Sequence, residues 1–334
     1  MKVIICNNTC KKQWNEFINK NSADFGLLQS WEWEVFQKTL GRGVFKVVVE
    51  ENSDILACAL VVKQTLRLGK SYFYIPRGPI LADNKFVGEK QVEVLELLFN
   101  KIKSLSKKEK AIFLRMDPAW NDNEDLKNIL ESSGFKSSGQ VQPKSTLILN
   151  LAKSEDDLLS DMKSKTRYNI KVAQKNGITI DRGEKYFKDF WNLTEKTSQR
   201  QEIISHDKNY YKKLLQVLSE LGIAELVVAK YKGEVIAANL MISANKWCIY
   251  LYGASDYEHR NKMAPHLLQW ESIKYAKESG CKYYDFWGVD DDKWPGITRF
   301  KKGFAQNKEF TNYIGSWDEV YSGIWYNMYK LLRK

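Results

Sequence analysis

The sequence of 334 residues has little of several residue types and features, and each shortage excludes a class of protein. Proline occurs only 6 times, while 43% of the residues are hydrophobic and 13% aromatic, which excludes a disordered chain. No stretch approaches the roughly 18 uninterrupted apolar residues of a transmembrane helix. The opening residues, MKVIICNNTCKKQW, lack the apolar run and cleavage site of a signal peptide, so we expect a cytoplasmic protein.

Histidine and cysteine are also scarce. We interpret each of the 3 histidines, His206, His259 and His266, as a surface or packing residue rather than a general base. The 5 cysteines are odd in number and scattered, as is typical of reduced thiols. Cys6 and Cys10 have no second pair and no nearby histidine, so we predict no metal site. The sequence also lacks Gly-x-Ser-x-Gly and a persuasive Cys–His pair, so we expect no enzyme nucleophile.

What is abundant is positive charge. The net charge of +11 favours a polyanionic partner, either a nucleic acid, a phosphorylated substrate or an acidic membrane surface, although an excess of lysine for solubility explains it equally well. In the stretch MKSKTRYNIKVAQK, the residues Arg167, Lys171 and Lys175 fall at i, i+4 and i+8 of a predicted helix. Such a basic stripe suits the phosphates of a tRNA acceptor arm or a pyrophosphate; the alternative is an ordinary solvated helix face.

The order of predicted elements occurs twice. DILACALVV, SYFYIPRG, VEVLELLFNKIKSL and AIFLRMD come first, and GEVIAANLMIS, CIYLYGAS, PHLLQWESIKYAKES and CKYYDFWG follow with an offset of about 170–180 residues. Each set reads strand, strand, helix, strand. We infer an internal duplication of an α/β unit, in which a mixed sheet is flanked by helices.

The duplicated order resembles the fold of the N-acetyltransferase (GNAT) superfamily of acyl-CoA enzymes. In that fold, the CoA pyrophosphate lies on a loop written R/Q-x-x-G-x-G/A before a helix. Here the loop reads Arg260-Asn-Lys-Met263-Ala-Pro265, so a methionine and a proline stand where the glycines should be. Because phosphate is bound best by bare backbone N–H groups and proline has none, we expect an acyl donor other than CoA.

Several stretches together are similar to the Fem family of peptidoglycan aminoacyltransferases. They are LLQSWEWEVFQKTLG, YIPRGPIL, MKSKTRYNIKVAQKNGI, YLYGASDYEHRNKMAPHLLQWESIKYA, CKYYDFWGV and ITRFKKGF, in this order over nearly the whole chain. The resemblance implies two tandem GNAT-like domains and transfer of an amino acid from aminoacyl-tRNA to an amine of the peptidoglycan stem peptide, with no cofactor. It places the acceptor cleft in residues 1–150 together with 317–334, and the aminoacyl-tRNA side in residues 151–316.

Some members of that family carry a coiled-coil arm, for which this chain has no room between NYYKKLLQVLSEL and ELVVAKY. It therefore resembles the compact FemX type, whose acceptor is a UDP-linked muropeptide, while a lipid-linked precursor and contact with the membrane surface stay open. Two other functions also stay open. One is a CoA-dependent acyltransferase, and the other is a protein that binds tRNA or a cell-wall precursor without catalysis.

The stretch ITRFKKGF holds the residues closest to the expected chemistry. Phe300 and Lys301 match a Phe-Lys dipeptide that, in the family, serves the tRNA end and the developing oxyanion. The alternative is a helix in which Phe300 and Phe304 anchor the core while both lysines lie in solvent. We expect Lys302 in solvent and Phe304 in the core in either case.

Three tyrosines of the second half match the substrate cleft of the family. Tyr250 and Tyr252 alternate along one strand, so we predict that they share a face of the sheet. The resemblance places Tyr252 and Tyr211 beside the sugar-peptide substrate; a buried aromatic ladder is the alternative. Asp207 stands near the position of a phosphate-binding arginine of the family.

In the first half, Asp117 ends the strand AIFLRMD, where a carboxylate could accept the proton of the acceptor amine or hold its ammonium. The alternative is a strand-ending Asp-Pro turn. Arg77 in PRGP resembles a basic position beside the substrate, and we interpret Gly78 as a residue that permits the turn. The phosphate-binding lysine of the family falls near Gln37 or Lys38.

Overall fold

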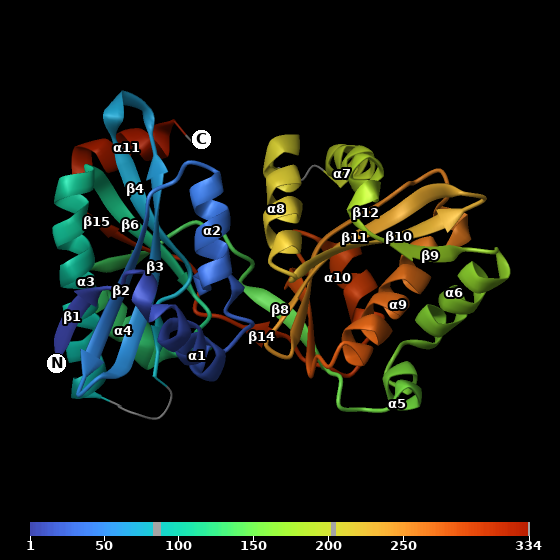
Figure 1. The fold of residues 1–334 in the computed structure, drawn as a ribbon, viewed down its shortest axis with the longest axis horizontal. Coiled ribbons are helices and arrows are strands. Elements are labelled where there is room, and N and C mark those ends of the chain that lie inside the picture. Colours follow the sequence, from blue (N-terminus) through green and yellow to red (C-terminus); the bar gives the residue numbers. More distant parts are fainter. Residues whose placement is uncertain (83–87, 202–204, 333–334) are drawn as a thin grey trace. The chain divides into compact units, whose positions relative to one another are not determined.

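The computed structural model describes residues 1–82, 88–201 and 205–332, which form two compact units. Unit 1 comprises Met1–Lys144 and Asn312–Lys334, and unit 2 comprises Ser145–Thr311. Each unit is a mixed sheet flanked by helices, which confirms the predicted α/β class (Figure 1). Within the described ranges, every helix is too short or too polar to cross a membrane.

Unit 1 is built on a sheet in the order β1-β2-β3-β4-β6-β15-β7, with β5 paired to β3. Its strands are β1 (Lys2–Ile5), β2 (Val44–Glu51), β3 (Asp54–Thr65), β4 (Ser71–Arg77), β5 (Ile80–Leu81), β6 (Ala111–Pro118), β7 (Phe135–Ser137) and β15 (Trp317–Val320). Its helices are α1 (Lys11–Asn21), α2 (Trp31–Thr39), α3 (Glu89–Glu109), α4 (Glu124–Ser132) and α11 (Gly323–Leu331), with short turns η1 (Asn8–Cys10), η2 (Leu27–Gln29) and η3 (Arg67–Gly69).

The long helix α3 covers one face of this sheet, and α1 and α2 cover the other (Figure 1). Apolar residues of α3 recur at helical spacing, so Val94, Leu98 and Ile102 are all buried against the sheet. On the opposite face, the buried ammonium of Lys46 in β2 donates to the buried carboxylate of Glu34 in α2. Unit 1 is therefore a three-layer structure with a polar pair in one of its two interfaces.

Unit 2 is built on a sheet in the order β14-β8-β13-β12-β11-β10-β9. Its strands are β8 (Ser145–Asn150), β9 (Thr179–Arg182), β10 (Ala224–Tyr231), β11 (Glu234–Ala244), β12 (Trp247–Ser255), β13 (Tyr283–Val289) and β14 (Thr311–Asn312). Its helices are α5 (Glu155–Ser160), α6 (Ser164–Lys175), α7 (Phe187–Gln201), α8 (Lys208–Glu220), α9 (Ala264–Glu278) and α10 (Pro295–Lys302), with short turns η4 (Glu184–Tyr186) and η5 (Arg260–Lys262).

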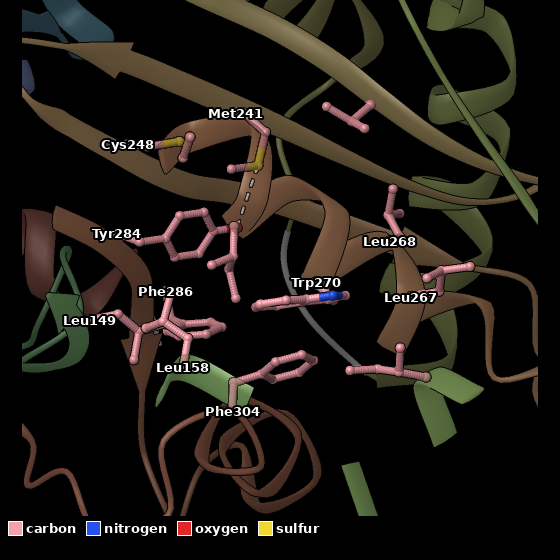
Figure 2. Packing of buried hydrophobic residues seen from close by; sticks show 14 of the residues in the cluster. Leu149, Leu158, Met241, Cys248, Leu267, Leu268, Trp270, Tyr284, Phe286 and Phe304 are labelled. Atoms are coloured by element: carbon pink, nitrogen blue, oxygen red, sulfur yellow. Dashed lines mark hydrogen bonds between the residues drawn. The ribbon is translucent and has the colours of Figure 1, made fainter. Parts of the chain in front are cut away.

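Helices α7 and α8 cover one face of the second sheet, and α6 and α9 cover the other (Figure 1). Figure 2 shows the core on the α9 side, where Trp270, Phe286 and Phe304 pack together with Leu158 of α5. The Tyr284 hydroxyl in this core donates to the sulfur of Met241 over 3.8 Å.

The strand pairing corrects the domain boundary expected at residue 150. β8 pairs with β13 in the sheet of unit 2 because Leu147 and Leu149 fill that core, so unit 2 begins at Ser145. At the other end of the chain, β15 returns to the sheet of unit 1 before helix α11 begins. The carboxylate of Asp318 in β15 receives two hydrogen bonds from Arg115 of β6, at 2.7 and 2.6 Å, and this buried pair holds the segment in the sheet.

Candidate functional site

The most unusual side chain of unit 2 is Lys301, near the end of α10. It is only 7% exposed, and its ammonium donates to the carbonyl of Gly288 at 2.7 Å and to that of Trp287 at 3.4 Å. Both acceptors belong to β13. The alternative in which both lysines of the stretch lie in solvent is therefore wrong for Lys301.

Lys301 lies where two parallel strands separate. In β12, residues Trp247–Ile249 pair with residues Tyr283–Asp285 of β13. Beyond these residues the two strands separate: β12 continues to pair with β11, and β13 with β8. The Lys301 ammonium occupies this opening, 5.5 Å from the centre of the Tyr250 ring. Separated strands leave backbone carbonyls without a ladder partner, and the ammonium satisfies two of them.

The electrostatics of this opening favour proton exchange near neutrality. Burial lowers the pKa of Lys301 to about 7, while the carboxylate of Asp285 acts in the opposite direction. Asp285 is buried, and it accepts hydrogen bonds from Thr146 and, at 2.7 Å, from the backbone N–H of Trp287. We did not select Asp285 from the sequence, although an acidic residue inside the apolar strand YYDFWGV was a signal for it.

The aromatic neighbours of Lys301 differ in exposure. Phe300 is half-buried, and its ring centre lies 5.3 Å from that of His266 and 5.3 Å from that of Phe304. Phe304 is fully buried in the core, as expected (Figure 2). Lys302 is half-buried, with its ammonium 3.9 Å from the Asp291 carboxylate and 4.6 Å from the centre of the Phe310 ring. Phe300 thus keeps an accessible edge that Phe304 lacks.

The histidines occupy packing or surface positions in the structure. Burial lowers the pKa of His266 to about 4, so its ring is neutral at physiological pH, and its Nε2 lies 3.2 Å from the side-chain amide of Asn169. His206 is exposed and His259 is half-buried. His266 therefore packs between the Phe300 ring and Asn169 of helix α6.

Helix α6 carries the predicted basic stripe, but its members differ. Lys171 and Lys175 are exposed, whereas the guanidinium of Arg167 donates to the carbonyls of Leu159 and Ser160, both at 3.3 Å, and to that of Met162. Arg167 is therefore engaged in capping the end of α5.

An aromatic residue completes the exposed face of α6. Tyr168 is 66% exposed and lies at i, i+3 and i+7 with Lys171 and Lys175, on one side of the helix. The helix begins beside α10, because the N–H of Lys163 donates to the carbonyl of Gly303 at 2.9 Å. Within unit 2, the start of α6 therefore contacts the end of α10, and Asn169 of α6 reaches the Phe300 ring through His266.

The prediction that Tyr250 and Tyr252 share a face is wrong. The pairing of β11 with β12 shifts between Leu240 and Met241, which pair with Tyr252 and Tyr250, so Leu251 is an extra residue that breaks the alternation. Tyr250 packs against the core on the α9 side, while the Tyr252 ring lies 4.9 Å from that of Tyr211 in α8.

Tyr211 is buried, and its ring also lies 5.9 Å from that of Phe190 in α7. This is the aromatic cluster that the sequence left open as an alternative to a substrate-lining role. Asp207, near the position of the family's arginine, caps α8, because its carboxylate accepts from the N–H of Tyr210 at 2.8 Å. An acidic N-cap is a sufficient structural reason for this residue.

In unit 1, Asp117 and Arg77 lie at the same ends of the parallel strands β6 and β4. Asp117 is buried and accepts a hydrogen bond from the hydroxyl of Ser316. Burial raises the pKa of Asp117 to about 6, although the Tyr74 hydroxyl and the guanidinium of Arg77 act to lower it. A carboxylate with this pKa can exchange a proton near neutral pH.

Arg77 makes three contacts with residues of unit 1. Its guanidinium donates to the carbonyl of Pro143 at 2.9 Å, stacks 4.4 Å from the centre of the Tyr313 ring and approaches the Asp24 carboxylate to 3.7 Å. The backbone of Arg77 is left-handed, with φ of 54°, which is unfavourable for a residue with a Cβ.

The reason for Gly78 differs from the one proposed above. Gly78 does not adopt a left-handed conformation; instead, a Cβ here would lie 2.5 Å from the amide carbon of Gln29. That buried amide donates to the carbonyl of Pro76 at 2.6 Å and accepts from the N–H of Leu60 at 2.7 Å. The glycine therefore permits close approach of a side chain rather than a turn.

Lys38 lies apart from Asp117 and Arg77, on the exposed side of α2. Its ammonium pairs with the Glu34 carboxylate at 2.8 Å, and both residues line a cavity of about 450 Å³ together with Lys46. The neighbouring Gln37 is buried and accepts a hydrogen bond from Arg42 at 2.7 Å. Of the two positions considered, only Lys38 has an exposed side chain.

The loop before α9 does not form a phosphate cradle of bare N–H groups. Met263 holds the left-handed conformation, with φ of 56°, that a glycine would adopt without strain, and Pro265 lies in the first turn of α9 without an N–H to donate. The loop therefore lacks the bare backbone N–H groups that a phosphate cradle needs.

Comparisons with known proteins show the family of this chain. The model of the FemAB family matches residues 9–232 and 216–334. A protein named lipid II:glycine glycyltransferase from Staphylococcus epidermidis is 26% identical over 359 residues, covering 85% of this chain and 84% of that protein. A protein of the same name from Staphylococcus aureus is 24% identical over 384 residues, covering 90% of this chain and 89% of that protein.

Solved structures support the same fold. The crystal structure of FemX covers 100% of both chains with a TM-score of 0.82 and 22% identity. A tandem GNAT protein from the clavulanic acid biosynthesis pathway covers 96% of this chain and 98% of that chain, with a TM-score of 0.61 and 12% identity. The predicted resemblance and the predicted tandem GNAT-like fold are both confirmed.

Proposed function

The chain belongs to the FemAB family, and from this premise we propose that it transfers an amino acid from aminoacyl-tRNA to an amine of a lipid-linked peptidoglycan precursor. The relatives that carry the name lipid II:glycine glycyltransferase match most of the chain, which supports a lipid-linked acceptor over a UDP-linked one and makes glycine the first amino acid to test.

The reaction requires positioning and charge stabilisation rather than an enzyme nucleophile. The neutral amine of the acceptor attacks the carbonyl carbon of the ester, and a C–N bond forms as the C–O bond to the tRNA ribose breaks. The amine loses one proton, and the ribose oxygen gains one. Negative charge develops on the carbonyl oxygen in between, and a fixed positive group near it lowers the barrier.

The observation that carries the proposal is the buried ammonium of Lys301 at the opening between β12 and β13. Preorganised donors in water-excluded sites stabilise an oxyanion far better than solvated ones. Phe300, half-buried beside it, offers a ring for the terminal adenine of the tRNA. We assign Lys301 to the oxyanion and Phe300 to the tRNA end.

The exposed face of α6 supports tRNA as the donor. Lys171 and Lys175 present positive charge next to the exposed ring of Tyr168, and lysines interleaved with an aromatic ring suit a nucleic acid backbone. The helix begins against the Gly303 carbonyl, two residues from Lys301. In this proposal Arg167 supports α5 and does not touch the tRNA.

In unit 1, we assign Asp117 to the amine of the acceptor. Its pKa of about 6 suits a group that takes a proton from the acceptor's ammonium, which leaves the neutral amine that attacks the ester. Tyr252 and Tyr211 keep their proposed place beside the acceptor, and so do Arg77 and Lys38. Tyr250 lies on the other face of the sheet, 5.5 Å from the Lys301 ammonium, and we assign it to the substrate at that opening instead. Among these, Lys38 has the most exposed side chain.

The test follows radiolabelled amino acid from charged total tRNA to lipid-linked precursor and, in parallel, to UDP-linked muropeptide. We expect label in the lipid-linked acceptor and a loss of about 100-fold or more in Lys301→Ala, the range seen when an oxyanion donor is removed. Lys302→Ala is the matched control, because the neighbouring ammonium lies outside the opening.

Two outcomes would count against the proposal. Label in neither acceptor, with the wild-type protein still binding tRNA, would favour a binding protein without catalysis. Transfer from acetyl-CoA in place of aminoacyl-tRNA would favour a CoA-dependent acyltransferase, which the loop of Met263 and Pro265 disfavours.

A further inference from the structure

The C-terminal helix α11 of unit 1 is apolar on both sides. Its inner side buries Tyr326 and Tyr329 against Phe113 of β6, with ring centres 5.1 and 4.9 Å away. Its outer side exposes Ile324, Met328 and Leu331, at i, i+4 and i+7, with Ile324 79% and Leu331 71% exposed. Leu332, the next residue, is exposed as well.

The inner contacts fix which side of the helix faces outward. The Tyr326 hydroxyl donates to the buried carboxylate of Asp318 at 2.7 Å, so the helix cannot rotate its aliphatic stripe inward without breaking a buried hydrogen bond. Exposed aliphatic residues scattered singly are normal, but four of them on one short segment are not.

The turn between β3 and β4 extends this apolar surface. Leu68 at its tip is 77% exposed and holds a left-handed conformation, with φ of 57°. Leu66 packs against the buried face of α11, and the ammonium of Lys70 lies 4.5 Å from the centre of the Trp325 ring, so the turn adjoins the helix. Figure 1 shows the tip of this hairpin beside α11. We define the α11 surface as Ile324, Met328, Leu331, Leu332 and Leu68.

Positive charge borders the α11 surface. Arg67 and Lys70 flank the tip of the turn, and Lys330 lies on α11 itself. In the described part of the chain, none of these three has a carboxylate within 4.0 Å, whereas the nearby Glu109 is already paired with Lys63 at 2.6 Å. The surface therefore combines aliphatic side chains with unneutralised cations.

We propose that the α11 surface docks unit 1 on an anionic lipid bilayer. Aliphatic residues that enter the boundary between headgroups and acyl chains, bordered by lysine and arginine, are what binds a protein to such a surface. A second copy of this chain fits less well, because a symmetric contact would bring the same cations together. The inference rests on the proposed function, since a lipid-linked acceptor lies at a membrane.

The experiment measures sedimentation of the full chain with vesicles of phosphatidylglycerol and phosphatidylcholine in equal parts, without tRNA or precursor. We expect binding to these vesicles and weaker binding to phosphatidylcholine alone. The double variant Ile324→Ser/Leu331→Ser should bind the vesicles at least about tenfold more weakly than the wild type. The single variants Arg67→Gln and Lys70→Gln should each bind about fivefold more weakly. Leu221→Ser, which changes an exposed leucine of unit 2, is the matched control and should bind as the wild type does.

The outcomes separate this proposal from the proposed function. Loss of binding in the double variant, with unchanged thermal unfolding and unchanged transfer to a water-soluble short-chain lipid-linked acceptor, supports docking. The proposal is overturned if the wild type does not bind the vesicles, if the double variant binds equally well, or if size-exclusion chromatography shows a wild-type dimer that the double variant abolishes. Absence of transfer to every acceptor would overturn the proposed function while leaving vesicle binding to be judged on its own.

Discussion

Units 1 and 2 share a strand order but differ in how the parallel strands β4 and β6, and β12 and β13, pair with each other. In unit 1, β4 and β6 stay paired along their whole length, from the pair Ser71 and Ala111 to the pair Arg77 and Pro118. In unit 2, β12 and β13 pair along three residues each and then separate. Among the described residues, the opening between parallel strands is therefore a feature of unit 2 and not of unit 1, and the buried amine of Lys301 lies in it.

The difference has a local physical cause. The pairing of β13 with β8 is irregular between Asp285 and Gly288, and Trp287 holds a left-handed conformation with φ of 58°. The N–H of Trp287 is satisfied by Asp285 and its carbonyl by Lys301. The irregular strand and the buried lysine thus depend on each other, so Lys301 contributes to structure as well as to the proposed chemistry.

The largest expected effect tests the charge of Lys301. If its ammonium stabilises the oxyanion, the ratio of wild-type to Lys301→Ala activity should fall about tenfold per pH unit above the pKa of about 7. Taking a ratio cancels the titration of the acceptor amine. A ratio that rises with pH would instead make Lys301 a neutral base, and a constant ratio would mean that its charge is not used.

The second prediction concerns Asp117, the buried titratable group of unit 1. Its pKa rises from 3.8 to about 6 on folding, so the folded protein binds this proton more tightly than the unfolded chain. The free energy of unfolding should therefore fall by about 3 kcal/mol between about pH 4 and pH 6 and stay at the lower value above about pH 6. This magnitude follows from about 1.36 kcal/mol for each unit by which folding raises the pKa. Chemical unfolding of Asp117→Asn should lack this fall. An identical pH dependence in variant and wild type would contradict the assignment.

The third prediction compares two glycines of unit 1. A methyl group at Gly78 would meet the buried amide of Gln29, so Gly78→Ala should destabilise the protein by about 1–3 kcal/mol. Gly139 has open space around it and no left-handed backbone, so Gly139→Ala is the control and should change thermal unfolding little. Equal effects would mean that the buried amide of Gln29 shifts without cost.

The smallest expected effect separates the members of the α6 stripe in unit 2. Lys171→Ala, Lys175→Ala and Tyr168→Ala should each weaken tRNA binding about two- to tenfold, and the lysine variants should also reduce its salt dependence. Arg167→Ala should lower thermal stability instead, because it removes the cap of α5. Filter binding at several salt concentrations, with thermal unfolding in parallel, checks both. Loss of tRNA affinity in a stable Arg167→Ala protein would contradict this division.

Several features of the site could be predicted from the sequence because they depend on neighbouring residues. The dipeptide of Phe300 and Lys301, the loop of Met263 and Pro265 and the repeat of elements were all visible there. Other features depend on partners far along the chain. Tyr250 and Tyr252 face different sides because of a bulge against β11, and Arg167 is held by the end of α5.

The sequence by itself determined where most helices and strands lie, that the fold is repeated and which family it resembles, because these follow from local periodicity and short motifs. Only the tertiary structure decided that Lys301 is buried while Lys302 is not, that β8 belongs to the second sheet and that β15 closes the first. Burial, and with it the pKa of a side chain, is set by which distant strands separate or pair. No local pattern in the chain encodes that choice.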